Sequence, residues 1–569
     1  MPAARLHVLP ALLLLTLPLP AQKKTAPPTP QQAEDAVLLA DVQAFDLWLK
    51  DYKTGAFRLV KNGAVDEAAL QQVDERMGKL AKWNVIGAAK MLFEAASVEP
   101  VLPGAHASTE VADFHRELQP WRVQALAQKH LRTMTGPGIV DWLIDMLGTR
   151  GRGSRPPAPA AAAAVLRVFA GHPSVEAQLE LLHACTSLPT ELRVKAVDAL
   201  SQGASLDTVP SLLDLLRDVE PNVRIAASNG LGHALAPLVD ETAGKHPDGE
   251  LLKTRDLVIQ RLKELLLREP IWQVRNAAAF ALAGLKCKPV VPALIDGLKA
   301  ELARKKDPWA MDMRLHRLLE GLTGQQVVPG DARLWEEFWK AEGERFTVAP
   351  KTAPGKPKPK SNKYQKFFDL EIESDRVLFL VDFSGSMAEA VTLAATGSTL
   401  AGKNGLTTTK AQLVVSELKK IVMGLPSGAM LNFVVFSDEA RCWREDRGRP
   451  ALVKLDDAAR DDLLGSFLDS LRPQGPTNLY AALDKAIEFA GRGLHDKYYE
   501  AGFDTLYVIT DGAPSVGEVT DKDEIRRRVR DANRLRKLTI HCITFGDKND
   551  TDFLRPLAEE NGGRHIHIE

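Results

Sequence analysis

Four short, almost continuously apolar runs alternate with helix-type stretches in residues 370–569 of the chain. The runs are VLFLVD from Val377, MLNFVVF from Met430, TLYVIT from Thr505 and LTIHCITF from Leu538. Strands that are apolar on both faces are typical of parallel sheets, because helices cover both sides of such a sheet. The pattern predicts a doubly wound, Rossmann-like α/β domain over this part of the chain.

Polar side chains stand where these strands end. In the sequence DFSGS after the first run, Asp382, Ser384 and Ser386 occupy alternate positions, so their side chains can point to one place. Asp511 follows the third run, and Thr477 lies in a loop that opens a helix. Ligands of open α/β sheets bind beyond the carboxyl ends of the strands. We therefore expect all five side chains at one edge of the sheet.

Three hydroxyls and two carboxylates form a set of donors that contains only oxygen. Such a set suits a hard divalent cation, above all Mg²⁺, with Mn²⁺ or Ca²⁺ as alternatives. If the aspartates act partly through water while the hydroxyls bind directly, the ion stays electron-poor and attracts a further anionic oxygen. The site is then expected to capture a carboxylate of a partner.

These five residues, in this order, resemble the metal-ion-dependent adhesion site of von Willebrand factor type A domains. The closing stretch GDKNDTDFLRPLAEENGGRHIHI also resembles the last helix and strand of bacterial and inter-alpha-trypsin-inhibitor-like members. The resemblance covers about a third of the chain. It implies that Ser384, Ser386 and Thr477 ligate Mg²⁺, and that Asp382 and Asp511 ligate it directly or hold its waters. A protein partner would complete the shell with an Asp or Glu carboxylate.

Two features depart from the family pattern. The family often has two glycines before the threonine, whereas this chain has Gly475 followed by Pro476. The fixed φ of proline is expected to restrict movement of the Thr477 loop. Residues 388–409 are also longer than the usual connection to the first helix, and they either shape partner choice or occlude the site.

Enzymatic sites fit the same residues poorly, so we expect a binding protein and not an enzyme. A DxDxT phosphatase needs a second aspartate where Ser384 stands, and a GxSxG nucleophile elbow needs glycines where Asp382 and Ser386 stand. A metal-assisted hydrolase remains the least favoured alternative. His565 and His567 share a face of the last strand and are expected to be surface residues rather than metal ligands. The basic helix over 524–537 is expected to expose its charged face to solvent.

The N-terminal half carries helical periodicity and an internal repeat. Residues 22–150 comprise a short leader and a helical region. The segments LRVKAVDAL, VRIAASNGL and VRNAAAFAL begin at Leu192, Val223 and Val274, and a polar insertion explains the longer second interval. Such helix pairs resemble HEAT-type repeats and predict an α-solenoid over 160–346. This solenoid is expected to be a second interaction surface. Alternatively, the chain is a scaffold in which the solenoid recognises the partner and the type A domain is structural or regulatory.

The ends and the linker predict an exported protein. Residues 1–21 have the pattern of a secretory signal peptide, with an apolar run over 8–19 and Ala21 as the cleavage point; an uncleaved anchor is the alternative. We expect a secreted or cell-envelope protein without a transmembrane segment in its mature chain. Residues 347–369 are rich in proline and lysine and are expected to form an extended linker.

Charge and cysteine content exclude other classes. A net charge of −1 offers no electrostatic reason for binding nucleic acid. The four cysteines are scattered through apolar patterns, so we expect buried thiols instead of a disulfide framework or a zinc site.

Overall fold

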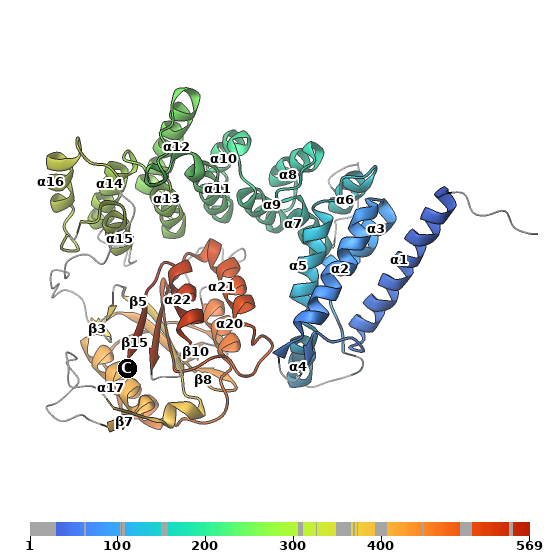
Figure 1. The fold of residues 1–569 in the computed structure, drawn as a ribbon. Coiled ribbons are helices and arrows are strands. Elements are labelled where there is room, and N and C mark those ends of the chain that lie inside the picture. The colour runs from blue at the N-terminus through green and yellow to red at the C-terminus, as the bar shows by residue number, and fades with distance from the viewer. Residues whose placement is uncertain are drawn as a thin grey trace, which may run out of the picture.

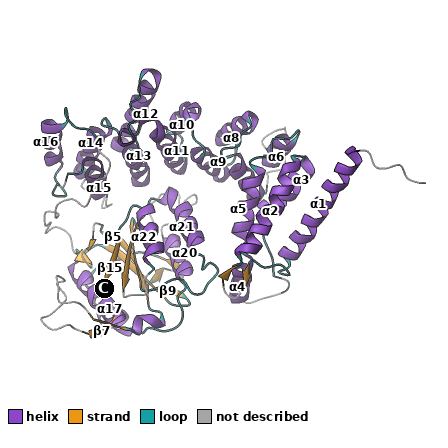
Figure 2. Ribbon diagram, in the orientation of Figure 1, coloured by secondary structure: helices purple, strands orange, loops and turns teal. Residues whose placement is uncertain are grey.

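A helical array and an α/β domain lie side by side in the protein (Figure 1). The computed structural model describes residues 30–568 except for gaps at 62–63, 103, 105–107, 149–157, 305–310, 326, 349–365, 368–369, 373, 393–406, 447–448, 490–502 and 546–549. The predicted signal peptide and most of the predicted linker therefore lie outside the described residues. Figure 2 shows the strands of the large sheet gathered in one block beneath the helices. The multidomain fold class predicted from the sequence, helices followed by an α/β domain, is confirmed.

The helical array is built on one continuous hydrophobic core that extends from Phe45 to Val348. Its helices are α1 (Pro30–Lys53), α2 (Glu67–Trp83), α3 (Ile86–Ala96), α4 (Ser108–Leu118), α5 (Pro120–Leu131), α6 (Ile139–Leu147), α7 (Pro159–Phe169), α8 (Val175–Ser187), α9 (Thr190–Gln202), α10 (Val209–Leu215), α11 (Pro221–Val239), α12 (Gly249–Arg268), α13 (Trp272–Gly284), α14 (Val290–Ala303), α15 (Met311–Thr323) and α16 (Ala332–Glu342). A short ribbon, β1 (Val60–Lys61) with β2 (Ala64–Val65), follows the first helix.

The three repeated segments of the sequence form α9, α11 and α13, which stack side by side. The arginine that recurs in each repeat forms an ion pair with an acidic residue farther along the chain, so each repeated helix is tied to the end of its unit. The pairs are Arg193 with Asp218, Arg224 with Glu269 and Arg275 with Glu301, at 2.6, 2.9 and 2.6 Å. This role explains why arginine recurs at that position. The HEAT-type assignment itself stays a prediction.

The large sheet of the α/β domain is mostly parallel. Its order is β12-β8-β5-β13-β14-β15, and β9 also pairs with β8. The strands are β5 (Arg376–Asp382), β8 (Met430–Phe436), β9 (Ala440–Cys442), β12 (Val453–Lys454), β13 (Thr505–Thr510), β14 (Thr539–Phe545) and β15 (His565–Ile568). The first strand, β5, lies between β8 and β13, so the direction of winding reverses beside it. Such a reversal is the usual ligand-binding point of doubly wound sheets.

Helices cover both faces of this sheet. α17 (Lys410–Gly424), α18 (Asp457–Asp462) and α19 (Leu468–Ser470) pack on one face, and α20 (Leu479–Phe489), α21 (Lys522–Arg536) and α22 (Thr551–Glu560) pack on the other. An aromatic row, Phe433, Phe379, Tyr507 and His541, crosses the buried sheet with successive ring centroids 4.9, 5.4 and 5.0 Å apart. Short ribbons join β3 (Lys366–Phe367) to β4 (Leu370–Glu371), β6 (Ala390–Thr392) to β7 (Thr407–Thr409) and β10 (Glu445–Asp446) to β11 (Arg449–Pro450).

The inner helices of the array contact the amino edge of the sheet. Arg314 of α15 donates hydrogen bonds to the carbonyl oxygens of Lys537 and Asp504, at 2.7 and 2.6 Å. These carbonyls belong to the residues just before β14 and β13, and the guanidinium also lies 5.0 Å from the ring centre of Trp272. Lys537 in turn donates to Asn229 of α11 at 2.7 Å. The array therefore holds the end of the domain opposite to the predicted metal edge.

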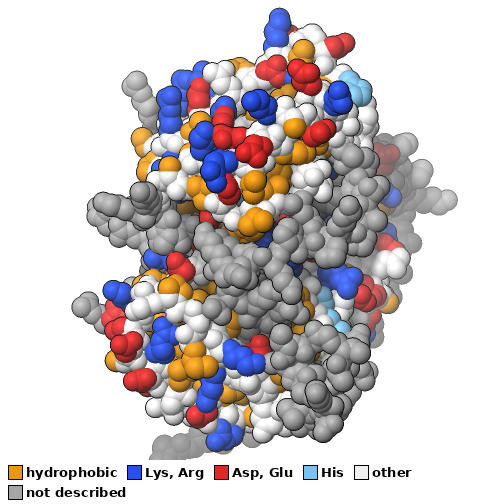
Figure 3. Space-filling view, turned by 90° about the vertical axis from the view of Figure 1, so that its left-hand side faces the viewer, with side chains coloured by type: hydrophobic (Ala, Val, Ile, Leu, Met, Phe, Trp, Pro, Cys, Tyr) orange, Lys and Arg blue, Asp and Glu red, His pale blue; other side chains and the backbone are white. Residues whose placement is uncertain are grey.

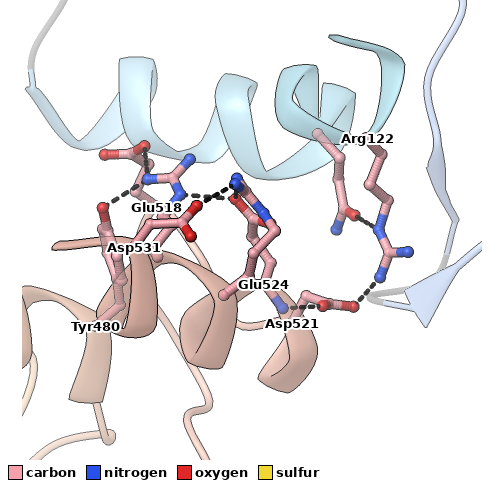
Figure 4. Close-up of polar contacts among 9 residues, drawn as sticks. Arg122, Tyr480, Glu518, Asp521, Glu524 and Asp531 are labelled. Atoms are coloured by element: carbon pink, nitrogen blue, oxygen red, sulfur yellow. Dashed lines mark hydrogen bonds and ion pairs between the residues drawn. The ribbon is translucent and has the colours of Figure 1, made fainter. Parts of the chain in front are cut away.

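The expectation that the basic helix over 524–537 faces solvent is wrong. This helix, α21, lies against the array: Arg534 pairs with Asp198 of α9, and Asp521 at its N-terminus pairs with Arg122 of α5 (Figure 4). Arg528 lies over the ring of Trp121, 4.7 Å from its centre. One side of the helix thus meets charged and aromatic partners of the same chain, whereas Asp523 and Arg530 on the same helix are exposed.

Surface charge, cysteine burial and helix hydropathy complete the description of the fold. On the face that Figure 3 presents, basic and acidic side chains are interspersed. Cys185, Cys287 and Cys542 are buried free thiols, whereas Cys442 is only half-buried. Within the described part of the chain, every helix is too short or too polar to cross a bilayer.

Candidate functional site

The carboxyl ends of β5 and β13 bring two of the predicted site residues together. Asp382 is the last residue of β5, and Asp511 follows Thr510, the last residue of β13. The two strands are parallel neighbours, with Val381 opposite Ile509. Both carboxylates therefore stand at the point where the winding of the sheet reverses.

Asp382 is completely buried, and both of its carboxylate oxygens accept hydrogen bonds. The backbone N–H of Ser384 donates to Oδ1 at 2.8 Å, and the hydroxyl of Thr510 donates to Oδ2 at 2.6 Å. Burial raises the pKa of Asp382 to about 6, although these hydrogen bonds oppose the shift. The site thus holds a carboxylate in a place where a positive charge would be stabilised.

The two serines of the DFSGS turn form a chain of hydroxyls toward the second aspartate. The hydroxyl oxygens of Ser384 and Ser386 lie 3.2 Å apart, and Ser386 Oγ donates to Asp511 Oδ1 at 2.8 Å. The turn continues as a single short helical turn, η3 (Gly385–Ala388). Ser384, Ser386 and Asp511 are therefore linked by side-chain hydrogen bonds, and Asp382 is linked to them through the backbone of Ser384.

The loop that carries the fifth residue, Thr477, is bonded to the same turn. Gly385 N–H donates to the carbonyl of Gly475 at 2.8 Å, and Gln474 N–H donates to the carbonyl of Phe383 at 2.8 Å. Gly475 has φ 73°, a conformation that favours glycine, and Pro476 follows it. The Gly-Pro sequence therefore belongs to the contact between the two loops.

Thr477 is also attached to the loop after Asp511. Its N–H donates to the hydroxyl of Ser515 at 2.9 Å, and its carbonyl accepts the N–H of Ser515 at 2.8 Å. The side chain of Thr477 is buried. The structure thus brings all five predicted residues to one edge of the sheet, from three separate segments of the chain.

Two residues at this edge were missed by the sequence analysis. Thr510 bonds Asp382, and Lys410 at the start of α17 donates to Asp511 Oδ2 at 2.8 Å and to Glu389 at 2.9 Å. The signal for Thr510 was its place at the end of a strand next to β5. Lys410 follows the long 388–409 segment, so its position could not be aligned with the site from sequence.

The donors at this edge fit a hard divalent cation. The hydroxyls of Ser384 and Ser386 and two carboxylates converge there, and the backbone of Thr477 is bonded to the loop after Asp511. The two carboxylates are buried where an unbalanced negative charge is unfavourable. In the part of the chain that the structure describes, no three His, Cys, Asp or Glu side chains gather in a way that could hold a metal ion. The candidate site therefore depends on hydroxyl oxygens, which a softer metal would not favour.

The two histidines of the last strand lie elsewhere in the domain. His565 and His567 share one face of β15, the strand at the end of the sheet, as expected. Their ring nitrogens lie 3.0 and 3.1 Å from the hydroxyl of Thr544. Both histidines are partly exposed.

Residues 403–566 match the family model of the von Willebrand factor type A domain. The match confirms the resemblance for the C-terminal domain; it begins after the DFSGS turn and includes Thr477 and Asp511. Inter-alpha-trypsin inhibitor heavy chain H1 of Sus scrofa is 29% identical over 212 residues, which are 37% of this chain and 20% of that protein. The chain thus spans about a fifth of the length of this curated relative.

Two solved structures are also similar to part of the chain. A von Willebrand factor type A protein from Catenulispora acidiphila has 19% sequence identity and a TM-score of 0.26, and the similarity covers 34% of this chain and 38% of that one. Proximal thread matrix protein 1 from the mussel byssus, whose MIDAS motif is occupied by zinc in that structure, has 14% identity and a TM-score of 0.24. The similarity covers 34% of this chain and 43% of that one.

Proposed function

We propose that the carboxyl edge of the sheet is a metal-ion-dependent adhesion site that binds a protein partner. The observation that carries this proposal is the convergence of Asp382, Ser384, Ser386, Thr477 and Asp511 at the point where the winding of the sheet reverses. Three separate segments supply these oxygens, and hydrogen bonds join the segments to one another. The match of residues 403–566, which include Thr477 and Asp511, to the type A family model supports the same proposal.

The hydroxyls and the carboxylates are expected to have different roles in holding the metal ion. Asp382 is held by Ser384 N–H and Thr510, and Asp511 is held by Ser386 and Lys410. Ser384, Ser386 and Thr477 would hold Mg²⁺ directly, with Mn²⁺ or Ca²⁺ as alternatives, and the aspartates would hold it or its waters. When bound, Mg²⁺ would supply a Lewis acid for a carboxylate oxygen from an Asp or Glu of the partner.

The helical array is the weaker candidate for recognising that partner. Its inner helices α9, α11, α13 and α15 contact the chain's own α/β domain through Asp198, Asn229, Asn276 and Arg314. That face is therefore covered, and any interaction surface on the repeats must use other faces. We propose a binding role without catalysis, in an exported protein directed by the signal pattern at residues 1–21.

Capture of partners by the full-length chain, with either Mg²⁺ or EDTA present, tests the proposal. We expect capture from an exported fraction with Mg²⁺, loss of capture with EDTA, and loss with Ser386→Ala. Ser470→Ala is the matched control, because Ser470 is exposed on α19 and its hydroxyl donates to the carbonyl of Phe467 at 2.7 Å. Capture that persists in EDTA and with Ser386→Ala would contradict the proposal. Turnover of an ester or phosphate that Ser384→Ala abolishes would favour the hydrolase alternative.

A further inference from the structure

A buried lysine lies in contact with the proposed metal site. The side chain of Lys410 is 6% exposed and that of Asp511 is 1% exposed. Lys410 Nζ donates to Asp511 Oδ2 at 2.8 Å, while Ser386 Oγ donates to the other oxygen of the same carboxylate at 2.8 Å. The chain therefore places a cation of its own on one of the two aspartates.

Local structure fixes this lysine in place. Lys410 is the first residue of α17, and the helix begins there because Thr409 and Gln412 cap it reciprocally through side chain and backbone. The β6–β7 ribbon pairs Ala390 with Thr409 just before it. Lys410 N–H also donates to the carbonyl of Glu389 at 3.1 Å. The ribbon that closes the 388–409 segment thus holds both ends of the segment beside the site.

A count of the buried charges shows what the lysine changes. Asp382 and Asp511 contribute two negative charges, and Lys410 contributes one positive charge. Glu389 is 48% exposed, so solvent screens its charge more strongly. With a dication added, the buried groups carry one net positive charge; without Lys410 they would carry none. Charges this close and this buried interact strongly. The difference of one positive charge therefore affects the affinity of the site for the metal ion and for an anionic partner.

We infer that Lys410 positions Asp511 and sets the charge of the site, lowering its affinity for a dication and raising the affinity of the loaded site for a carboxylate. This inference rests on the proposed function. By occupying Oδ2, Lys410 leaves Oδ1 directed to the hydroxyl of Ser386. By adding a positive charge, it repels the metal ion and attracts the anionic partner. The β6–β7 ribbon, which pairs Ala390 with Thr409, therefore shapes the site through the lysine that follows it.

Isothermal titration calorimetry of Mn²⁺ binding to the full-length chain tests the inference. We expect Lys410→Met to bind Mn²⁺ about tenfold more tightly than the unaltered chain. Lys419→Met on the same helix is the matched control, because Lys419 pairs with the exposed Asp469 at 2.6 Å, and it should bind Mn²⁺ unchanged. Saturating acetate should raise the affinity for Mn²⁺ more in the unaltered chain than in Lys410→Met.

A second variant tests the inference without removing the buried lysine, so its result does not depend on whether Lys410→Met folds. Glu389→Gln keeps the buried contact between Lys410 and Asp511. It removes a negative charge that partly offsets the positive charge of Lys410, so it should weaken Mn²⁺ binding about threefold. A purely structural role for Lys410 would weaken binding in both variants. Equal or weaker binding by folded Lys410→Met, beside clear binding by the unaltered chain, would overturn the inference and leave the adhesion site standing. Absence of Mn²⁺ uptake by every variant would overturn both.

Discussion

The hydroxyl of Ser386 lies 2.8 Å from Oδ1 of Asp511, although the two residues are 125 positions apart in the chain. This contact joins the turn after β5 to the loop after β13. The same carboxylate accepts Lys410 on its other oxygen. Asp511 therefore connects three of the elements beside the proposed metal site: the turn after β5, its own loop and the start of α17.

Asp511→Asn should lower the free energy of unfolding by about 3 kcal/mol in EDTA, because it leaves the buried Lys410 with only the half-exposed Glu389 as a partner. Urea titration followed by fluorescence measures the change. Asp469→Asn, which breaks the exposed pair with Lys419, should stay within about 0.5 kcal/mol. The double variant Asp511→Asn/Lys410→Met should recover most of the loss; no recovery would show that the two residues are not coupled.

Arg314→Met should destabilise the contact between the array and the domain by about 3 kcal/mol. The change leaves the carbonyls of Lys537 and Asp504 without their charged donor in a buried place. Calorimetry should then resolve separate unfolding of the α/β domain. Arg333→Met removes an exposed pair with Asp331 on α16 and should leave the transition unchanged. An unchanged transition for both variants would contradict the role given to Arg314.

Gly475→Ala should cost about 1 kcal/mol and weaken Mn²⁺ binding, because its φ of 73° is unfavourable for alanine and the loop carries Thr477. Gly87→Ala is the matched control. Gly87 lies in α3 at a position where an added Cβ meets no atom within 4 Å, so alanine should be neutral or slightly stabilising there. If both variants bind Mn²⁺ equally, the turn conformation does not govern the site.

Lys537 predicts a pH dependence of stability. Burial, together with Arg534 and Arg314, lowers its pKa to about 8, and Asp198 opposes the shift only in part. Between that value and the ordinary pKa of lysine, the unfolded chain binds more protons than the folded chain, so stability rises with pH across this window. The penalty is fully present below pH 8 and amounts to about 3 kcal/mol.

Urea titrations between pH 7 and pH 10.5 measure this effect. Lys537→Met should remove the rise, whereas Lys522→Met, which removes an exposed lysine at the start of α21, should retain it. A rise of equal size in Lys537→Met would assign it to other groups.

Much of the α/β domain could be predicted from the sequence because its strands are apolar on both faces. The runs from Val377 and Thr505 became β5 and β13, and the rule that ligands bind at carboxyl ends placed Asp382 and Asp511 together. The contact of Lys410 could not be predicted, since it depends on how the β6–β7 ribbon closes a long segment.

The contact between the array and the domain could not be predicted for a different reason. Arg314 meets Lys537 across 223 positions, and a polar helix face has the same periodicity whether it meets water or a polar protein surface. The sequence predicted a basic helix over 524–537 with a charged face. It contained no information on what would cover the charged face.

The array contacts the amino edge of a parallel sheet whose carboxyl edge carries the proposed adhesion site. A partner that pulled on that site would therefore load β13 along its length, because Asp511 follows this strand and Arg314 of the array holds the carbonyl of Asp504 just before it. The tension would pass along the covalent backbone of that strand, which lies between its parallel neighbours β5 and β14.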